Sequence, residues 1–77
     1  METMVLIGER IKSARGFHRM TQSDVANALD VTVQTVSNWE NGRRCPDAET
    51  IRALVMMFNV TADWLLGLSD NPQKRTN

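Results

Sequence analysis

The fold of this chain is decided by residues 21–42, which read TQSDVANALDVTVQTVSNWENG. Apolar residues recur at helical spacing in two short segments of this stretch. Each segment starts with a threonine, Thr21 or Thr32, whose hydroxyl can cap free backbone amides. Leu29 ends the first segment only about three residues before Thr32, so the two helices must cross steeply. Asp30 lies in that turn and tolerates a positive φ better than most residues do. The stretch therefore predicts two helices joined by a tight turn.

Helical spacing continues on both sides of this unit. Apolar residues at i, i+4 and i+7 predict an earlier helix from about residue 6 to 17. Two further caps, Asp47 and Thr61, predict a fourth and a fifth helix. The chain is therefore expected to be all-α, with one domain of five helices over residues 1–68. Residues 69–77 are polar and include a proline, so a disordered tail or linker is expected there.

Composition narrows the function classes. A chain of 77 residues has room for one small core, and 42% hydrophobic with 23% charged residues is ordinary for a globular domain. Neither a membrane span nor a signal segment is present, so a cytoplasmic protein is expected. A lone Cys45 and a lone His18 can supply neither an internal disulfide nor a structural zinc site. His18 has no obvious nucleophile partner, so we expect no enzyme, no metal and no cofactor.

Nine basic and nine acidic residues cancel, which at first argues against a polyanionic partner. The basic residues are unevenly placed, however: Arg10, Lys12, Arg15, Arg19, Arg43, Arg44, Lys74 and Arg75 account for most of them. A neutral total is compatible with one basic and one acidic face, and equally with scattered solvated charges. Only the fold distinguishes these two interpretations.

The third helix has two different faces. At 100° per residue, Val36 and Trp39 point one way. The opposite side carries polar, uncharged side chains: Gln34, Ser37, Asn38 and Asn41. Gln and Asn can pair bidentately with adenine in the DNA major groove, and Val33 can meet a thymine methyl. On an isolated helix such residues are usually solvated surface, but beside a tight turn they favour DNA reading.

Residues 21–42 resemble the helix-turn-helix of the Cro and phage-repressor (Xre-type) family. The preceding IGERIK at 7–12 and the following FNVTADWLL at 58–66 match the family pattern too. The resemblance covers most of the chain. It implies a five-helix, lambda-repressor-like DNA-binding domain whose helix-turn-helix is formed by the second and third helices.

The resemblance also implies roles for individual residues. The base-reading positions of the recognition helix fall on Val33, Gln34 and Asn38. Gln22, at the start of the second helix, is implied to bind a backbone phosphate together with the helix N-terminus. Border and phosphate contacts are implied for the following residues: Thr32, Ser37, Asn41, Arg43 and Arg44.

A structural role is implied for Arg15, which is expected to form a partly buried ion pair with Glu40. The sequence departs from the family pattern at Asp30, which replaces the usual turn glycine, and at His18 and Arg19, where a helix-ending glycine is common. No basic residue lies on the recognition helix. Guanine reading by arginine is therefore missing, which shifts the expected site toward A·T-containing steps.

The leading interpretation is a sequence-specific DNA-binding transcriptional regulator, a repressor linked to a phage or mobile element. A module of this size contacts one half-site, so a homodimer on a pseudo-palindromic double-stranded DNA operator is expected. Four apolar residues near the end exceed what one short helix buries: Trp64, Leu65, Leu66 and Leu68. They form either a dimer surface or the last part of the monomer core.

A second class of function remains open. The same fold can serve as a protein-interaction module, an antirepressor or antitoxin that binds another regulator or a toxin. Zero net charge and the uncharged recognition face favour this alternative.

Overall fold

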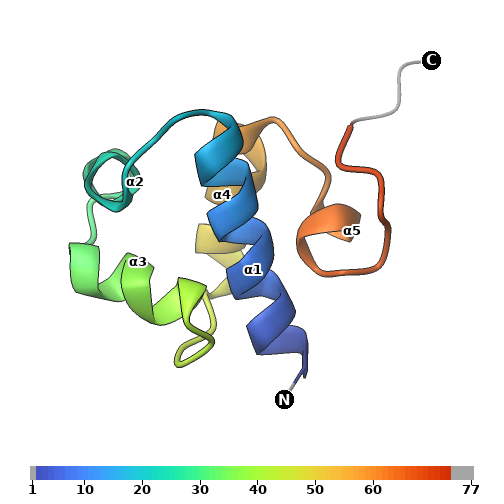
Figure 1. Cartoon of the computed structure of the whole chain (residues 1–77), viewed down its shortest axis with the longest axis horizontal. Helices are drawn as coiled ribbons and strands as arrows, with labels where there is room; N and C mark the ends of the chain where they lie inside the picture. Colours follow the sequence, from blue (N-terminus) through green and yellow to red (C-terminus); the bar gives the residue numbers. More distant parts are fainter. Residues whose placement is uncertain (1, 74–77) are drawn as a thin grey trace.

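The computed structural model describes residues 2–73 and contains five helices: α1 (Glu2–Phe17), α2 (Gln22–Leu29), α3 (Val33–Glu40), α4 (Ala48–Phe58) and α5 (Ala62–Leu65). Within these residues there is no strand, so the expected all-α, five-helix fold is confirmed. Helix α1 runs through the middle of the molecule, with α2 and α3 on one side, α5 on the other and α4 behind (Figure 1). None of the helices in this part of the chain has the length and apolarity needed to cross a lipid bilayer.

Helix α1 begins four residues before the predicted start at residue 6. The first turns of α1 are helical from Glu2 onward. They are supported by contacts with distant parts of the chain, because Val5 packs on Gly42 and Leu6 packs on Gly67. Local sequence signals therefore place this helix start too late.

The other four helices begin where their caps predicted. The hydroxyl or carboxylate of each cap accepts a hydrogen bond from the backbone N–H three residues later, at 2.9–3.1 Å. The four caps are Thr21, Thr32, Asp47 and Thr61. At α2 the contact is reciprocal, since Asp24 Oδ2 accepts from the Thr21 N–H at 2.8 Å. Each such cap contributes about 1 kcal/mol.

All five helices end in the same way. A residue with positive φ follows each helix, and the next N–H donates to the carbonyl five residues back at 2.7–3.1 Å, which satisfies a terminal carbonyl. The five positive-φ residues are Arg19, Asp30, Gly42, Asn59 and Gly67. Asp30 and Arg19 thus adopt the conformation for which the family pattern uses glycine.

The core collects apolar side chains from every helix. Its fully enclosed members are Ile7, Ile11, Val25, Val36, Leu54, Phe58 and Leu65. Trp64 is only 8% exposed, so Trp64 and Leu65 complete the monomer core and do not line a dimer surface. Leu66 is half-buried, whereas Leu68 is 75% exposed. Of the four residues considered for a dimer surface, Leu68 alone is mainly solvent-facing.

Helices α1 and α3 pack backbone against backbone at Gly8. A Cβ on this residue would overlap the carbonyl oxygen of Trp39 and lie 3.0 Å from that of Glu40. Glycine therefore permits a close approach that any side chain would prevent. Since Trp39 and Glu40 form the last turn of α3, this contact fixes the end of that helix against α1.

Residues 69–73 lie against the domain. Their polar composition does not predict this packing. The Thr61 N–H donates to the Pro72 carbonyl at 3.1 Å. Arg10 donates to the Ser69 carbonyl at 3.3 Å, lies 3.5 Å from the Asp70 carboxylate, and has its guanidinium 4.7 Å from the Trp64 ring centroid. The rest of the expected tail, 74–77, lies outside the described residues.

Candidate nucleic-acid interface

Helices α2 and α3 form the predicted helix–turn–helix. Asp30, at φ 56° and ψ 47°, takes the left-handed conformation that reverses the chain after α2. The Val31 N–H then donates to the Ala26 carbonyl at 2.9 Å. Ala26 is 2% exposed, so its small side chain lies inside the unit. This turn orients α3 so that one of its faces is free.

The two faces of α3 are divided as the sequence predicts. Val36 is fully buried and Trp39 is 3% exposed, which anchors the inner face in the core. Val33, at 44% exposure, and Gln34 lie open to solvent at the first turn. The other polar residues of this face are exposed or half-buried: Thr32, Ser37, Asn38 and Asn41. The structure therefore brings the three expected base-reading residues, Val33, Gln34 and Asn38, together on one helix.

Side chains on this outer face are paired along the helix. Gln34 Nε2 donates to Asn38 Oδ1 at 3.0 Å, and Asn41 Nδ2 donates to Ser37 Oγ at 3.2 Å. An amide group has two N–H donors and a carbonyl acceptor, so each pair leaves donors and acceptors over for another molecule. The side chains of the outer face are thus ordered, and some of their hydrogen-bond donors and acceptors are still free to bind another molecule.

Arg43 and Arg44 follow α3 and are both exposed. Their backbone N–H groups donate to the Asn38 carbonyl at 2.9 and 3.3 Å, so the turn folds back onto the last turn of α3. The four other helices have an apolar residue after the positive-φ position, whereas α3 has Arg43. A positive charge is thereby held at the end of the outer face.

Asp47 lies in the loop after the arginines, and the pKa of its carboxyl group is shifted. Its pKa is lowered from the ordinary value, chiefly because its carboxylate accepts the Thr50 N–H, with a smaller contribution from the charge of Arg44. The carboxylate therefore remains ionised to lower pH than an ordinary aspartate.

Glu40 joins three helices. Its side chain is 3% exposed and accepts from Arg15 Nε at 2.7 Å and Arg15 Nη2 at 3.1 Å, which gives the ion pair between α1 and α3. This hydrogen bonding raises the pKa of Arg15. Gln22 Nε2 also donates to Glu40 Oε1 at 3.1 Å. Sequence reasoning missed this third contact, because residues 22 and 40 come together only once α2 and α3 have packed.

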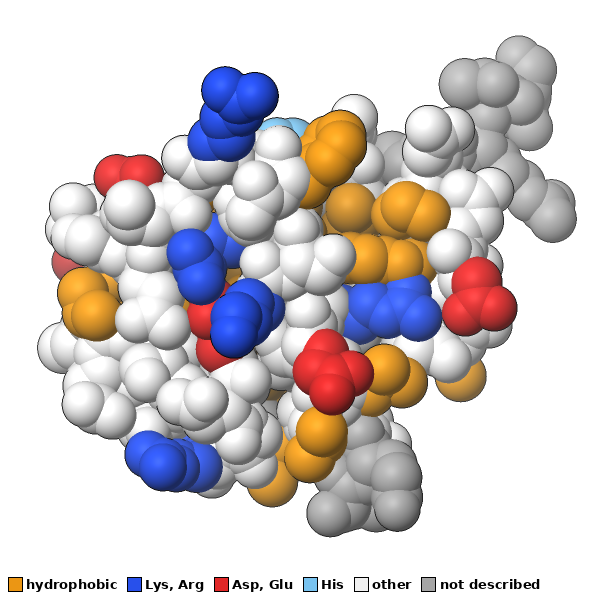
Figure 2. All heavy atoms as spheres, viewed as in Figure 1, with side chains coloured by type: hydrophobic (Ala, Val, Ile, Leu, Met, Phe, Trp, Pro, Cys, Tyr) orange, Lys and Arg blue, Asp and Glu red, His pale blue; other side chains and the backbone are white. Residues whose placement is uncertain are grey.

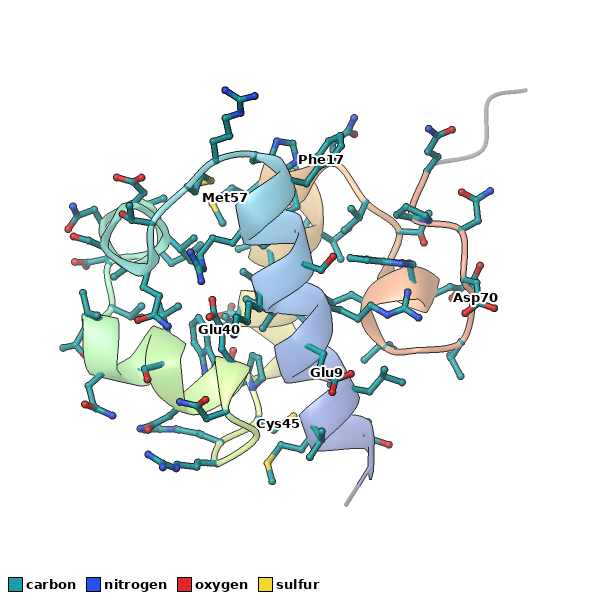
Figure 3. All side chains as sticks on the ribbon, in the orientation of Figure 1. Glu9, Phe17, Glu40, Cys45, Met57 and Asp70 are labelled. Atoms are coloured by element: carbon teal, nitrogen blue, oxygen red, sulfur yellow. The ribbon has the colours of Figure 1, made fainter. Side chains whose placement is uncertain are left out.

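Arg10, one of the unevenly placed basic residues, has its guanidinium directed at Trp64 and Asp70 and not at α3. Its partner Asp70 lies beside α5, whereas Glu40 lies between α1 and α3 (Figure 3). In the face shown in Figure 2, basic side chains are interspersed with acidic ones and uncharged surface. The scattered arrangement describes this face better than one continuous basic patch.

Gly8 was also missed as a residue that shapes the site. Its close contact with the end of α3 orients the helix that carries the outer face. The available sequence signal was a glycine inside a helical pattern, where it costs about 1 kcal/mol relative to alanine and so invites a packing explanation.

This geometry is that of a helix-turn-helix domain. A family model described as helix-turn-helix matches residues 11–65, which is more than half of the chain. The chain belongs to this helix-turn-helix family. The resemblance to Xre-type and phage-repressor proteins is thereby confirmed.

Curated relatives are transcriptional regulators by name. The HTH-type transcriptional regulator ImmR of Bacillus subtilis (strain 168) is 35% identical over 68 residues, which cover 88% of this chain and 54% of ImmR. Repressor protein CI of Enterobacteria phage phi80 is 35% identical over 71 residues, which cover 92% of this chain and 30% of the repressor. The chain thus spans about half the length of ImmR and less of the phage repressor.

A solved structure supports the fold. The restriction-modification controller protein C.AhdI from Aeromonas hydrophila superposes with a TM-score of 0.75 at 20% identity, covering 84% of this chain and 98% of that one.

Proposed function

We propose that this protein is a sequence-specific DNA-binding transcriptional regulator that acts as a repressor. The observation that carries the proposal is the outer face of α3, where Val33, Gln34 and Asn38 are presented by a helix whose other face is anchored in the core. An α-helix fits the major groove, and these side chains match adenine edges and thymine methyls. The names of two relatives, the transcriptional regulator ImmR and the phage repressor, also support this proposal. The proposed activity is binding, with no catalytic step.

Backbone contacts are assigned to residues around this face. Gln22 approaches one phosphate, and Arg43 and Arg44 approach phosphates beyond the end of α3. Thr32, at the start of the helix, borders the reading face. Because the whole chain has zero net charge, these few contacts replace a general attraction to DNA. Base contacts therefore carry an unusually large share of the affinity.

The small contact that one domain can make with DNA favours a homodimer. One helix in one half-site reads few base pairs, so two copies are needed for an operator-like affinity. Leu68, exposed after α5, is the apolar side chain that we assign to the dimer surface. The dimer places two copies of α3 about one helical turn apart on a pseudo-palindromic operator.

Selection of bound sequences from a random duplex pool tests this function. The expected result is enrichment of two inverted half-sites with A·T-containing steps, their centres about 10 base pairs or a multiple of that apart. Failure to enrich any sequence at about 50 mM salt would contradict the proposal, because electrostatic contacts are strong at low salt. That outcome would favour the protein-interaction alternative, an antirepressor or antitoxin.

A further inference from the structure

The carboxylate of Glu40 is shared between two partners with different roles. Arg15 provides two N–H donors from α1, and Gln22 provides one from α2. With 3% of its side chain exposed, Glu40 cannot reach DNA itself. Any influence that it has on DNA must pass through these partners.

Arg15 balances the charge of this carboxylate. Its Nε and Nη2 form the bidentate pair, and its Nη1 donates to the Met20 carbonyl at 2.9 Å, just before the cap of α2. An enclosed negative charge without a partner would repel a phosphate brought close to it. The guanidinium of Arg15 removes that repulsion while it holds the carboxylate in one orientation.

Gln22 is held by one of its two amide hydrogens. Nε2 carries two N–H donors, and one of them is directed at Glu40 Oε1. The residue is half-buried, so part of its side chain is still open to solvent. A free glutamine loses rotamer entropy when it binds a ligand, whereas a glutamine that is already held loses less.

We propose that Glu40 is a positioning residue for DNA binding: by holding one N–H of Gln22, it directs the other N–H at a backbone phosphate. Arg15 makes this arrangement possible, because it cancels the charge of Glu40 next to that phosphate. The inference rests on the proposed DNA-binding function, in which Gln22 contacts a phosphate. It adds that the contact depends on a buried residue of the neighbouring helix.

Two variants separate positioning from mere stabilisation. Glu40→Gln keeps a side-chain oxygen that can accept from Gln22, whereas Glu40→Met has a similar size but removes the acceptor. The probe is the duplex recovered by selection, made in versions that each replace one phosphate by an uncharged methylphosphonate. The measured quantity is the ratio of the dissociation constants for the modified and unmodified duplex. Because each protein serves as its own reference, a general loss of stability cancels in this ratio.

For the wild-type protein we expect one phosphate whose replacement weakens binding about tenfold, the effect of one hydrogen bond to a charged group. Glu40→Met and Gln22→Ala should each reduce this ratio to about threefold or less, leaving the general electrostatic loss, and Glu40→Gln should keep it near tenfold. In a Gln22→Ala background, Glu40→Met should change the ratio no further.

The inference is overturned if Glu40→Met keeps the wild-type ratio, or if no single phosphate replacement weakens wild-type binding. If the wild-type protein binds no duplex at all, the proposed function itself fails, which is a different result.

Should Glu40→Met not fold, amide relaxation in the free wild-type protein tests the same point. A Gln22 side-chain amide with an order parameter near 0.85 supports positioning, and a value below about 0.6 contradicts it.

Discussion

Gly8→Ala tests whether the backbones of α1 and α3 touch as closely as the structure shows. The new methyl group would overlap the Trp39 carbonyl oxygen and stand 3.0 Å from that of Glu40, where ordinary contact starts at 3.4 Å. Both obstacles are backbone atoms, so the helices must separate by about 1 Å. Such overpacking costs up to about 3 kcal/mol, and the higher helix propensity of alanine returns about 1 kcal/mol. The expected net loss of unfolding free energy is about 2 kcal/mol.

Gly16→Ala in the same helix is the matched control, because a Cβ built there meets no atom within 4 Å beyond its chain neighbours and the nearby backbone of its own helix. This substitution should stabilise the protein by about 0.5 kcal/mol. Urea unfolding followed by the fluorescence of the two tryptophans measures both variants. With a slope of about 1 kcal/mol per molar urea, the Gly8→Ala midpoint should fall by about 2 M. Equal stability of the two variants would refute the close α1–α3 contact.

Three further predictions address the site, the loop and the dimer. Gln34→Ala should cost about 1–3 kcal/mol of DNA affinity and relax preference at one base pair, whereas Arg43→Ala should weaken all sequences alike; equal losses on all sequences for both would contradict the assigned roles. Asp47→Asn keeps the cap but removes the charge. Because the pKa of Asp47 is lowered in the folded state, its carboxylate stabilises the fold above the ordinary value of 3.8, and this contribution is lost as pH falls through the lowered pKa. The difference in urea midpoint between wild type and variant should therefore shrink as the pH falls below 3.8 and vanish once the carboxylate is protonated in the folded state. A difference in midpoint that does not change with pH would contradict this prediction. Leu68→Ser should weaken self-association measured by sedimentation while leaving the unfolding midpoint of the monomer unchanged; an unaltered dimer would exclude Leu68 from the interface.

Features with a local cause could be predicted from the sequence. A cap acts on an amide only three residues away, so Thr21, Thr32, Asp47 and Thr61 each identified a helix start. The outer face of α3 follows from helical periodicity once the apolar side is known. The left-handed turn at Asp30 is equally local, since it depends on the residue's own backbone preference.

Features that depend on packing could not be predicted. Gln22 meets Glu40 only when α2 and α3 have docked, and Arg10 turns toward Trp64 and Asp70 only when α5 lies against α1. Neither contact has a signature at short sequence separation. The charges of Arg10, Lys12, Arg15 and Arg19 therefore cannot be assigned to one face before the fold is known.

The central claim is that the outer face of α3 reads a DNA sequence. Its most direct test is to titrate the selected duplex and a scrambled duplex with the wild-type protein over a range of salt concentrations. We predict that the selected duplex binds at least about 1,000-fold more tightly. The log affinity should fall with log salt with a slope of only about −4, as expected for two arginine–phosphate contacts from each protomer of a dimer. Equal affinity for the two duplexes, or no binding to either at about 50 mM salt, would contradict the claim.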